Sequence, residues 1–384
     1  MQMLLTVTIK SFIQLNFQRS FLPEKAIYKK LGEVELSPYM RNSTLYNDGE
    51  AAIKATQQAM CFADFMKHDL SKTKQNFELF WNAQDAILFP KLENLVSKYS
   101  YIPITKINNR LDASMALHQL LLTTTGISNV IGAGSLQEYS RIGKTVIGTA
   151  ANFDKIFEFI ENNQIDFCKI ERNAFKLIDL FAKIYEQLVP VVALRNGNCV
   201  ENVDKEQHGI MTANFNELSD FYAKSFEWIL ENVAIIIGLN NIYLRSDWKQ
   251  CVNGKTYADF LKETKGNRLQ NGYIGEKEPF SKSVNSLNNK IRNAIQHFDS
   301  DIDYKTQLLT FKDRNKSVNL YLLEFADLCI ENFCIIFYIL ELIYNLQKST
   351  LTQEGNVPIF LINNLEVQRT SNRKNREKGT LNLW

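Results

Sequence analysis

The sequence predicts a mainly α-helical protein, and three observations favour that class. Gly and Pro are scarce, at 16 and 7 residues in a chain of 384, whereas Phe occurs 25 times. Apolar residues recur at intervals of three and four over long stretches, which is the period of an amphipathic helix. Hydrophobic residues make up 45% and charged residues 22% of the chain, as in folded globular proteins. A many-turned β architecture, a disordered chain and a collagen-like chain are therefore excluded.

The net charge and the spacing of the cysteines exclude further kinds of protein. The 44 basic and 42 acidic residues give a formal net charge of +2, so the chain has no global basic surface for nucleic acid. The six cysteines show no two-residue spacing of the zinc-knuckle or redox type, and we expect buried thiols in a reducing compartment. The longest apolar run, Phe333 to Leu340, is far shorter than the roughly 20 residues of a membrane-spanning helix. Because the N-terminus also lacks the basic region of a signal peptide, we expect a cytoplasmic protein with no membrane partner.

The first half of the chain predicts a run of helices after a short strand in the first 45 or so residues. Helical spacing covers the ranges 48–70, 74–99, 114–123, 153–161 and 167–188. We expect a kink near Pro90, a helix cap at Ser114 and a helix end at Pro190. The glycine-rich stretch 126–148 is expected to be a flexible connection between helices.

A polar, turn-rich segment from Arg195 to Met211 predicts a domain boundary. We therefore expect three parts: an N-terminal helical domain over residues 1–205, a helical bundle over 213–348 and a C-terminal extension over 349–384. The extension carries a predicted strand at 359–362. It ends in a basic tail from Arg369 onward, which is either a solvated end or a contact to an RNA backbone.

The predicted bundle contains four long helices with a small insertion. The helices are expected over residues 215–237, 248–265, 280–303 and 318–347. Gly238 should close the first of these helices, and Ser317 should cap the last. A short strand at 307–311 predicts a β-hairpin insertion before the last helix.

The predicted helix 280–303 has an unusual polar face. Its apolar face is an ordinary core-facing stripe. The opposite face carries amide, guanidinium and imidazole groups with few solubilising charges, from Asn285, Asn289, Arg292, Asn293, Gln296 and His297. Such a mixture of groups is typical of a functional site rather than of a solvated surface.

Arg292 and His297 are separated by four residues, and Asn293 directly follows the arginine. The motif closes the third of four predicted helices and precedes an acidic hairpin and a long apolar helix. This arrangement resembles the HEPN superfamily, whose members include ribonucleases of abortive-infection and toxin systems, and the resemblance covers roughly residues 213–348. It implies a HEPN-like four-helix bundle, a homodimer with a composite active site, and RNA cleavage without a metal or other cofactor.

The residue types in the motif suit attack of an RNA 2′-hydroxyl on the adjacent phosphate. An imidazole can serve as general acid or base near neutral pH, and an arginine can hold a phosphate bidentately. Positions five apart on a helix lie about 140° apart, so a second copy across a two-fold axis would help Arg292 and His297 to converge. We expect Arg292, His297 and Asn293 to be catalytic, and Asn289 and Gln296 to contact RNA.

The expected function is therefore a metal-independent endoribonuclease acting in bacterial anti-phage defence or as a toxin. The first domain is a candidate sensor or regulator, and an antitoxin or a phage-derived trigger is a candidate partner. One alternative is a catalytically inactive HEPN module that dimerises or binds nucleotides and regulates a partner protein. Another places a separate enzyme activity in the glycine-rich stretch.

Two other motifs do not predict a site. Asp299, Asp301 and Asp303 alternate as in a calcium loop, but Tyr304 and Thr310 stand where that loop requires glycine and glutamate. A solvated turn is the preferred interpretation of these aspartates.

Gly143 and Lys144 invite comparison with a phosphate-binding loop, but Glu138 stands where its first glycine is required. The histidines outside the motif have no partner at metal-ligand spacing. We expect structural or surface roles for His68, His118 and His208.

Overall fold

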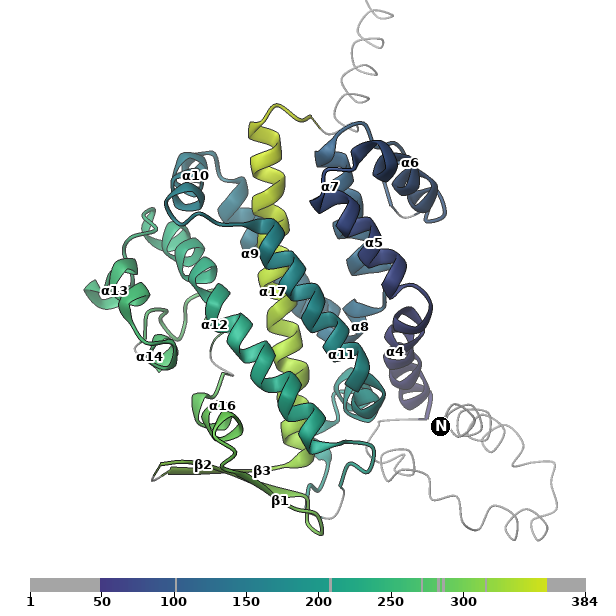
Figure 1. Cartoon of the computed structure of the whole chain (residues 1–384), viewed down its shortest axis with the longest axis vertical. Helices are drawn as coiled ribbons and strands as arrows, with labels where there is room; N and C mark the ends of the chain where they lie inside the picture. Colours follow the sequence, from purple (N-terminus) through teal and green to yellow (C-terminus); the bar gives the residue numbers. More distant parts are fainter. Residues whose placement is uncertain are drawn as a thin grey trace, which may run out of the picture.

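Helix α17 (Leu322–Gln353) runs along the centre of the molecule and is flanked by helices from both halves of the chain (Figure 1). This computed structural model describes residues 49–357, apart from residues 101, 207–208, 271, 282–283, 285–286 and 315. The predicted strands in the first 45 residues and at 359–362 and the basic tail lie outside the described residues. None of the helices described is both long enough and apolar enough to cross a bilayer.

The fold is mainly α-helical, as the sequence predicts, with a small three-stranded antiparallel sheet near its C-terminal end. The first half contains α4 (Gly49–His68), α5 (Leu70–Trp81), α6 (Asp85–Val96), α7 (Arg110–Thr123), α8 (Ile127–Ile131), α9 (Ala133–Gly148), η1 (Ala150–Asn152), α10 (Phe153–Asn162), α11 (Phe167–Asn196) and η2 (Val200–Asn202). The second half contains α12 (Phe215–Arg245), η3 (Val252–Gly254), α13 (Tyr257–Lys262), α14 (Lys265–Gln270), α16 (Asn289–Gln296), β1 (Ser300–Asp303), β2 (Leu308–Asp313), β3 (Lys316–Tyr321) and α17.

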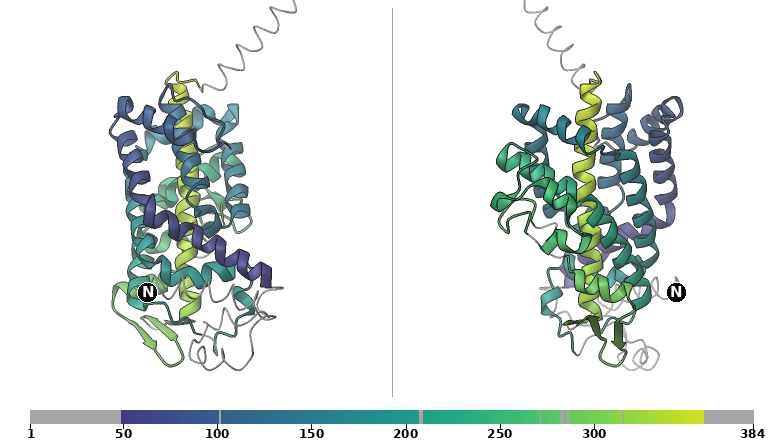
Figure 2. Two further views of the ribbon diagram at one scale, coloured as in Figure 1. Left: turned by 90° about the vertical axis from the view of Figure 1, so that its right-hand side faces the viewer. Right: turned by 60° about the vertical axis from the view of Figure 1, so that its left-hand side comes forward.

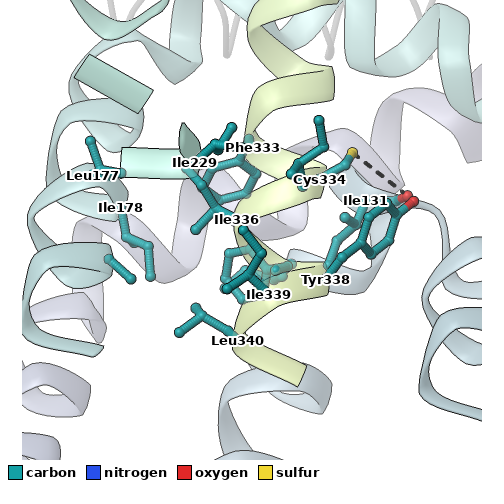
Figure 3. Packing of buried hydrophobic residues seen from close by; sticks show 14 of the residues in the cluster. Ile131, Leu177, Ile178, Ile229, Phe333, Cys334, Ile336, Tyr338, Ile339 and Leu340 are labelled. Carbon is teal, nitrogen blue, oxygen red and sulfur yellow. Dashed lines mark hydrogen bonds between the residues drawn. The ribbon is translucent and has the colours of Figure 1, made fainter. Parts of the chain in front are cut away.

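The hydrophobic core forms around α17, which contacts α7, α8, α9, α11 and α12. The fully buried rings of Phe181 and Phe333 stack with their centroids 3.7 Å apart. Figure 3 shows Ile336 and Ile339 of α17 in this buried cluster, and the Cys334 thiol donates a long hydrogen bond (3.9 Å) to a carbonyl of α8. Burial of each such apolar side chain stabilises the fold by roughly 1.5–3 kcal/mol.

Both sides of the predicted domain boundary pack against α17. The segment between Asn196 and Phe215 links α11 to α12, and both of these helices contact α17 and each other. One continuous core cluster includes residues from both predicted parts. The division of the chain at residues 205 and 213 therefore stays a prediction.

Neither of the two prolines ends its helix. Pro90 is within α6, and the break between α5 and α6 falls at residues 82–84, where Ala83 has a φ of 52°. Pro190 is within α11, which continues to Asn196. The predicted end at Pro190 was wrong because the residues after it, such as Leu194 at 0% exposed, are buried. Their burial compensates for the hydrogen bond that proline cannot make.

The helix predicted to begin at Ser114 begins earlier, and the glycine-rich stretch is helical rather than flexible. The Asn109 side chain caps α7 by accepting a hydrogen bond from the Asp112 N–H (3.0 Å). Residues 126–148 form α8 and α9, separated by Gly132 with a φ of 81°. A side chain at Gly143 would meet Leu342 of α17, so this glycine allows close helix packing.

Two of the four helices predicted for the second half are long, and the other two are replaced by shorter elements. The helix predicted to close at Gly238 continues to Arg245 because Gly238 lies within α12 against the Phe159 ring. The range 248–265 contains the short elements η3 and α13. In the range 280–303, the described helix α16 is limited to Asn289–Gln296, and residues 300–303 form β1. A bundle of four long helices in this half was therefore a wrong prediction.

The predicted hairpin is present and has a third strand. β1 pairs with β2 and β2 pairs with β3, both antiparallel, with Ser300 opposite Phe311 and Lys312 opposite Ser317. Ser317 therefore lies in β3 and does not cap α17. That helix begins after Tyr321, whose N–H donates to the Glu324 carboxylate (2.8 Å). The sheet lies at the end of the molecule where α17 begins (Figure 2).

Candidate functional site

Helix α16, which carries the R-x4-H motif, is short and lies between α12 and the sheet (Figure 1). The Asn288 side chain caps its N-terminus by accepting a hydrogen bond from the Lys290 N–H (3.0 Å). Ile291 and Ala294 are buried at 1% exposed each and form the apolar face. The opposite face carries Arg292 and its neighbours, and its side chains contact α12 and α14.

Arg292 is fixed by a carboxylate of the neighbouring long helix. Its Nε donates to Glu227 Oε1 (2.6 Å), and its Nη2 donates to the same oxygen. Its Nη1 donates to the side-chain oxygen of Asn293 (2.8 Å). Only 16% of the Arg292 side chain is exposed, so these partners determine how the guanidinium is oriented.

Glu227 gathers further polar groups around Arg292. It accepts hydrogen bonds from Gln296 (3.2 Å) and from Lys265 of α14 (3.3 Å). Burial would raise the pKa of the Glu227 carboxyl, but the hydrogen bonds and charges of Arg292 and Lys265 lower it on balance. Lys265 also pairs with Glu231, one turn further along α12. The cluster therefore joins α12, α14 and α16 around an ionised carboxylate.

Asn293 and Asn289 occupy different environments. The Asn293 amide also donates to Asp313 at the end of β2 (3.1 Å), which ties the motif to the sheet. Asn289 is buried at 6% exposed, and its amide donates to the Gly266 carbonyl of α14. Of the two residues expected to contact RNA, Gln296 is exposed, whereas Asn289 faces the protein interior.

His297 lies at the C-terminal cap of α16 and is exposed. Its ring forms no hydrogen bond or ion pair with any residue that the structure describes. The structure thus brings Arg292, Asn293 and Gln296 together through Glu227, and it leaves the His297 ring open to solvent. Sequence reasoning missed Glu227, whose only signal is its position on the polar side of α12, four residues before Glu231.

A second polar cluster, which the sequence did not predict, is buried between α7, α9 and α17. The His118 ring lies 2.6 Å from Glu341 through Nε2 and 3.0 Å from the Lys348 ammonium through Nδ1. Glu341 also accepts hydrogen bonds from Ser140 (2.6 Å) and Asn345 (3.0 Å). We call His118, Ser140, Glu341, Asn345 and Lys348 the buried network.

The charges of the buried network follow from its geometry. Burial lowers the pKa of His118 in spite of Glu341, so the ring is neutral near pH 7. Burial would raise the pKa of Glu341, but His118, Ser140 and Lys348 lower it to about 2. Burial lowers the pKa of Lys348 to about 8. His118 therefore donates from Nε2 to Glu341 and accepts at Nδ1 from Lys348.

Glu171 of α11 extends the polar groups beside the buried network. It accepts hydrogen bonds from the Trp81 indole and from Gln347 (3.0 Å). Burial raises the pKa of Glu171 to about 7. The hydrogen bonds from the two neutral donors lower the pKa and so offset only part of the effect of burial. The sequence signal for this region is the presence of Glu341 and Asn345, four apart, within the apolar helix α17.

The remaining predicted positions do not form a site. Asp303 accepts hydrogen bonds from the Lys305 N–H (2.9 Å) and the Thr306 hydroxyl (2.8 Å), which is the geometry of a solvated turn. Within residues 49–357, where described, no three His, Cys, Asp or Glu side chains are grouped so that they could hold a metal ion. His68 is exposed and His118 is buried, whereas His208 lies outside the described residues.

Comparison with known proteins gives no relative. A scan against models of protein families, a search of curated proteins and a search of solved structures each return no match to the chain.

Proposed function

We propose that the chain is a metal-independent endoribonuclease of HEPN type, acting in bacterial anti-phage defence or as a toxin. The observation that supports this function best is the placement of the R-x4-H residues. Arg292 is held by Glu227 and Asn293, and the exposed His297 ring lies at the end of the same helix without a partner among the described residues. An imidazole and a guanidinium are the two groups that RNA cleavage by a 2′-hydroxyl needs.

The hydrogen bonds of Arg292 leave room for a phosphate. A guanidinium has five N–H donors, and three of those of Arg292 are used by Glu227 and Asn293. One donor on each terminal nitrogen remains to hold two oxygens of a scissile phosphate. In the proposed reaction, His297 takes the proton from the 2′-hydroxyl while Arg292 stabilises the negative charge that develops on the phosphate.

A second copy of the chain completes the proposed site. The reaction needs a group that accepts a proton from the 2′-hydroxyl and a group that returns one to the leaving 5′-oxygen. Among the described residues, one protomer offers a single exposed histidine at this surface. A two-fold axis near α16 would place His297 of a second protomer beside Arg292 and would supply the second group.

The second candidate function is an inactive module that regulates a partner protein by dimerising or binding nucleotides. The ion pair between Arg292 and Glu227 favours it, because the carboxylate already neutralises the guanidinium. In that case the cluster serves to hold α16 against α12, and RNA is not a substrate.

Cleavage of RNA in the presence of EDTA separates the two candidates. The purified protein should cleave single-stranded RNA under these conditions, and His297→Ala should abolish both the cleavage and any toxicity in cells. His68→Ala is the matched control, since His68 is also exposed but lies on α4. If His297→Ala remains as active or as toxic as the parent protein, the catalytic assignment is wrong. If the parent protein binds nucleotides but leaves RNA intact, the second candidate holds.

A further inference from the structure

Helix α16 ends in a turn that places Phe298 in a left-handed backbone conformation. The Asp299 N–H donates to the Ala294 carbonyl (2.8 Å) and the Phe298 N–H donates to the Ile295 carbonyl (3.3 Å), which is the pattern of a Schellman motif. Phe298 has a φ of 58°. Glycine is the usual residue at this position because a side chain there is strained. Phenylalanine therefore destabilises the turn relative to glycine.

Packing within the protomer does not compensate for this strain. The Phe298 side chain is 93% exposed, so the ring is almost entirely in water. Of the eight described non-glycine residues with a positive φ, Phe298 is the only aromatic one. An exposed ring on a strained residue directly after His297 suggests a role that the isolated protomer does not fulfil.

Basic side chains lie beside Phe298 at one end of the sheet. The Lys312 N–H donates to the Asp299 carbonyl (2.9 Å), so this part of β2 adjoins the end of α16. Lys312, Arg314 and Lys316 are all exposed, and none forms an ion pair with a described residue. Of the two carboxylates close to these basic residues, that of Asp313 accepts a hydrogen bond from the Asn293 amide, and that of Asp299 is exposed next to Phe298.

We propose that Phe298 stacks on an unpaired RNA base, and that Lys312, Arg314 and Lys316 bind the phosphates of the same strand. The inference rests on the proposed function, since the stacked base would set the adjacent phosphate beside His297. Aromatic side chains combined with basic ones are the usual surface for single-stranded nucleic acid. The proposed contact between two copies near α16 does not by itself account for Phe298, because a ring in the buried core of an interface packs against apolar side chains, whereas the neighbours of Phe298 in the sequence and on β2 are polar.

The test uses the His297→Ala protein, so that RNA is bound but not cut, and a fluorescein-labelled single-stranded RNA of about twelve nucleotides. Fluorescence anisotropy gives the affinity. Adding Phe298→Gly should weaken binding about tenfold, although glycine relieves the strain and should raise the melting temperature. Phe298→Trp should bind as tightly as phenylalanine. Replacing Lys312 by Gln should reduce the salt dependence of binding by about one released ion.

Tyr304→Ala is the matched control, because Tyr304 is a second exposed aromatic residue, 77% exposed, beyond the far end of β1. Its loss should leave the affinity unchanged. Equal binding with and without the Phe298→Gly substitution would overturn the stacking proposal while leaving the proposed function intact. A Phe298→Gly protein that loses its dimer in solution but keeps its affinity for RNA would overturn it in favour of a contact between copies. No RNA binding by the His297→Ala protein, together with no cleavage of RNA by the parent protein, would remove both proposals.

Discussion

Arg292 of α16 is bound by Glu227 of α12, 65 residues earlier in the chain. The orientation of the motif arginine is thus set by a long helix of the core and not by the short helix that carries it. Both side chains are largely buried, at 16% and 28% exposed. The interaction is therefore screened less by water and salt than an ion pair on the surface.

Arg292 and Glu227 should be energetically coupled. Either single change leaves a partly buried charge without its partner, whereas the double change removes both. We expect Arg292→Ala and Glu227→Gln to give a coupling free energy of about 1–3 kcal/mol in a double-mutant cycle of urea unfolding. The exposed pair Asp220 and Lys224, at 52% and 53% exposed, is the control and should give about 0.5 kcal/mol or less. Additive effects at Arg292 and Glu227 would show that the pair does not orient the motif.

His118, for which the sequence predicts a structural or surface role, should contribute strongly to stability. His118→Ala would leave Glu341 and Lys348 buried without the ring that joins them. We expect the free energy of unfolding to fall by about 3 kcal/mol, measured by denaturant titration. The exposed His68→Ala should change it by about 0.5 kcal/mol at most. Similar values for the two variants would contradict the hydrogen bonds assigned to the buried network.

Glu171 should make stability depend on pH between about 4.5 and 7. The folded state keeps the proton up to pH about 7, whereas an unperturbed glutamate loses it near 4.5. Its raised pKa therefore stabilises the fold fully below pH 4.5, and this contribution is lost as the pH rises through 7. As the pH rises across this range, the free energy of unfolding should fall by about 3 kcal/mol less in the Glu171→Gln protein than in the parent protein.

The measurement is the unfolding free energy of parent and variant at several pH values in urea. Glu186→Gln is the control, since Glu186 is an exposed carboxyl on the same helix. If Glu171→Gln and Glu186→Gln follow the same pH profile, Glu171 is not protonated in the folded protein at pH 6.

Gly238 should not tolerate a side chain. A Cβ atom there would lie 2.2 Å from Cζ of Phe159, whose ring is fully buried. Gly238→Ala should therefore lower stability by about 1–3 kcal/mol, as overpacking does, in thermal or urea unfolding. Gly134→Ala in α9 has nothing within 4 Å of the new atom and should leave stability unchanged or raise it. A stabilised Gly238→Ala protein would mean that Phe159 can move aside.

Helical periodicity predicted the regions whose burial follows a regular stripe. The expected range 153–161 matches α10 closely, and 215–237 falls within α12. The range 318–347 overlaps α17 but includes residues of β3, because Val318 and Leu320 pair with β2 and are unavailable to the helix. The start of α17 is thus set by the pairing of β3 with β2. A local sequence pattern carries no information about such contacts between segments.

The same limit applies to the candidate site. The polar face of α16 predicted that Arg292, Asn293 and Gln296 lie together, because their spacing alone determines that. Asn289 belongs to the same face by spacing, but α14 covers it through Gly266. Glu227 could not be predicted as the partner of Arg292, since nothing in the local pattern says which distant helix lies opposite α16.

The central position of α17 has a consequence for synthesis of the protein. A ribosome releases α7, α9 and α11 well before residues Leu322–Gln353, against which all three helices pack. During that interval the faces that pack against α17 lack this partner, although α11 can already contact α4 and α7 can already contact α5 and α6. Exposed apolar surface of this kind favours aggregation or binding to chaperones. The α12 surface that holds Arg292 likewise lacks its support until α17 emerges. The complete core, and with it the folded state of a ribonuclease of the proposed kind, would therefore form only when translation is nearly finished.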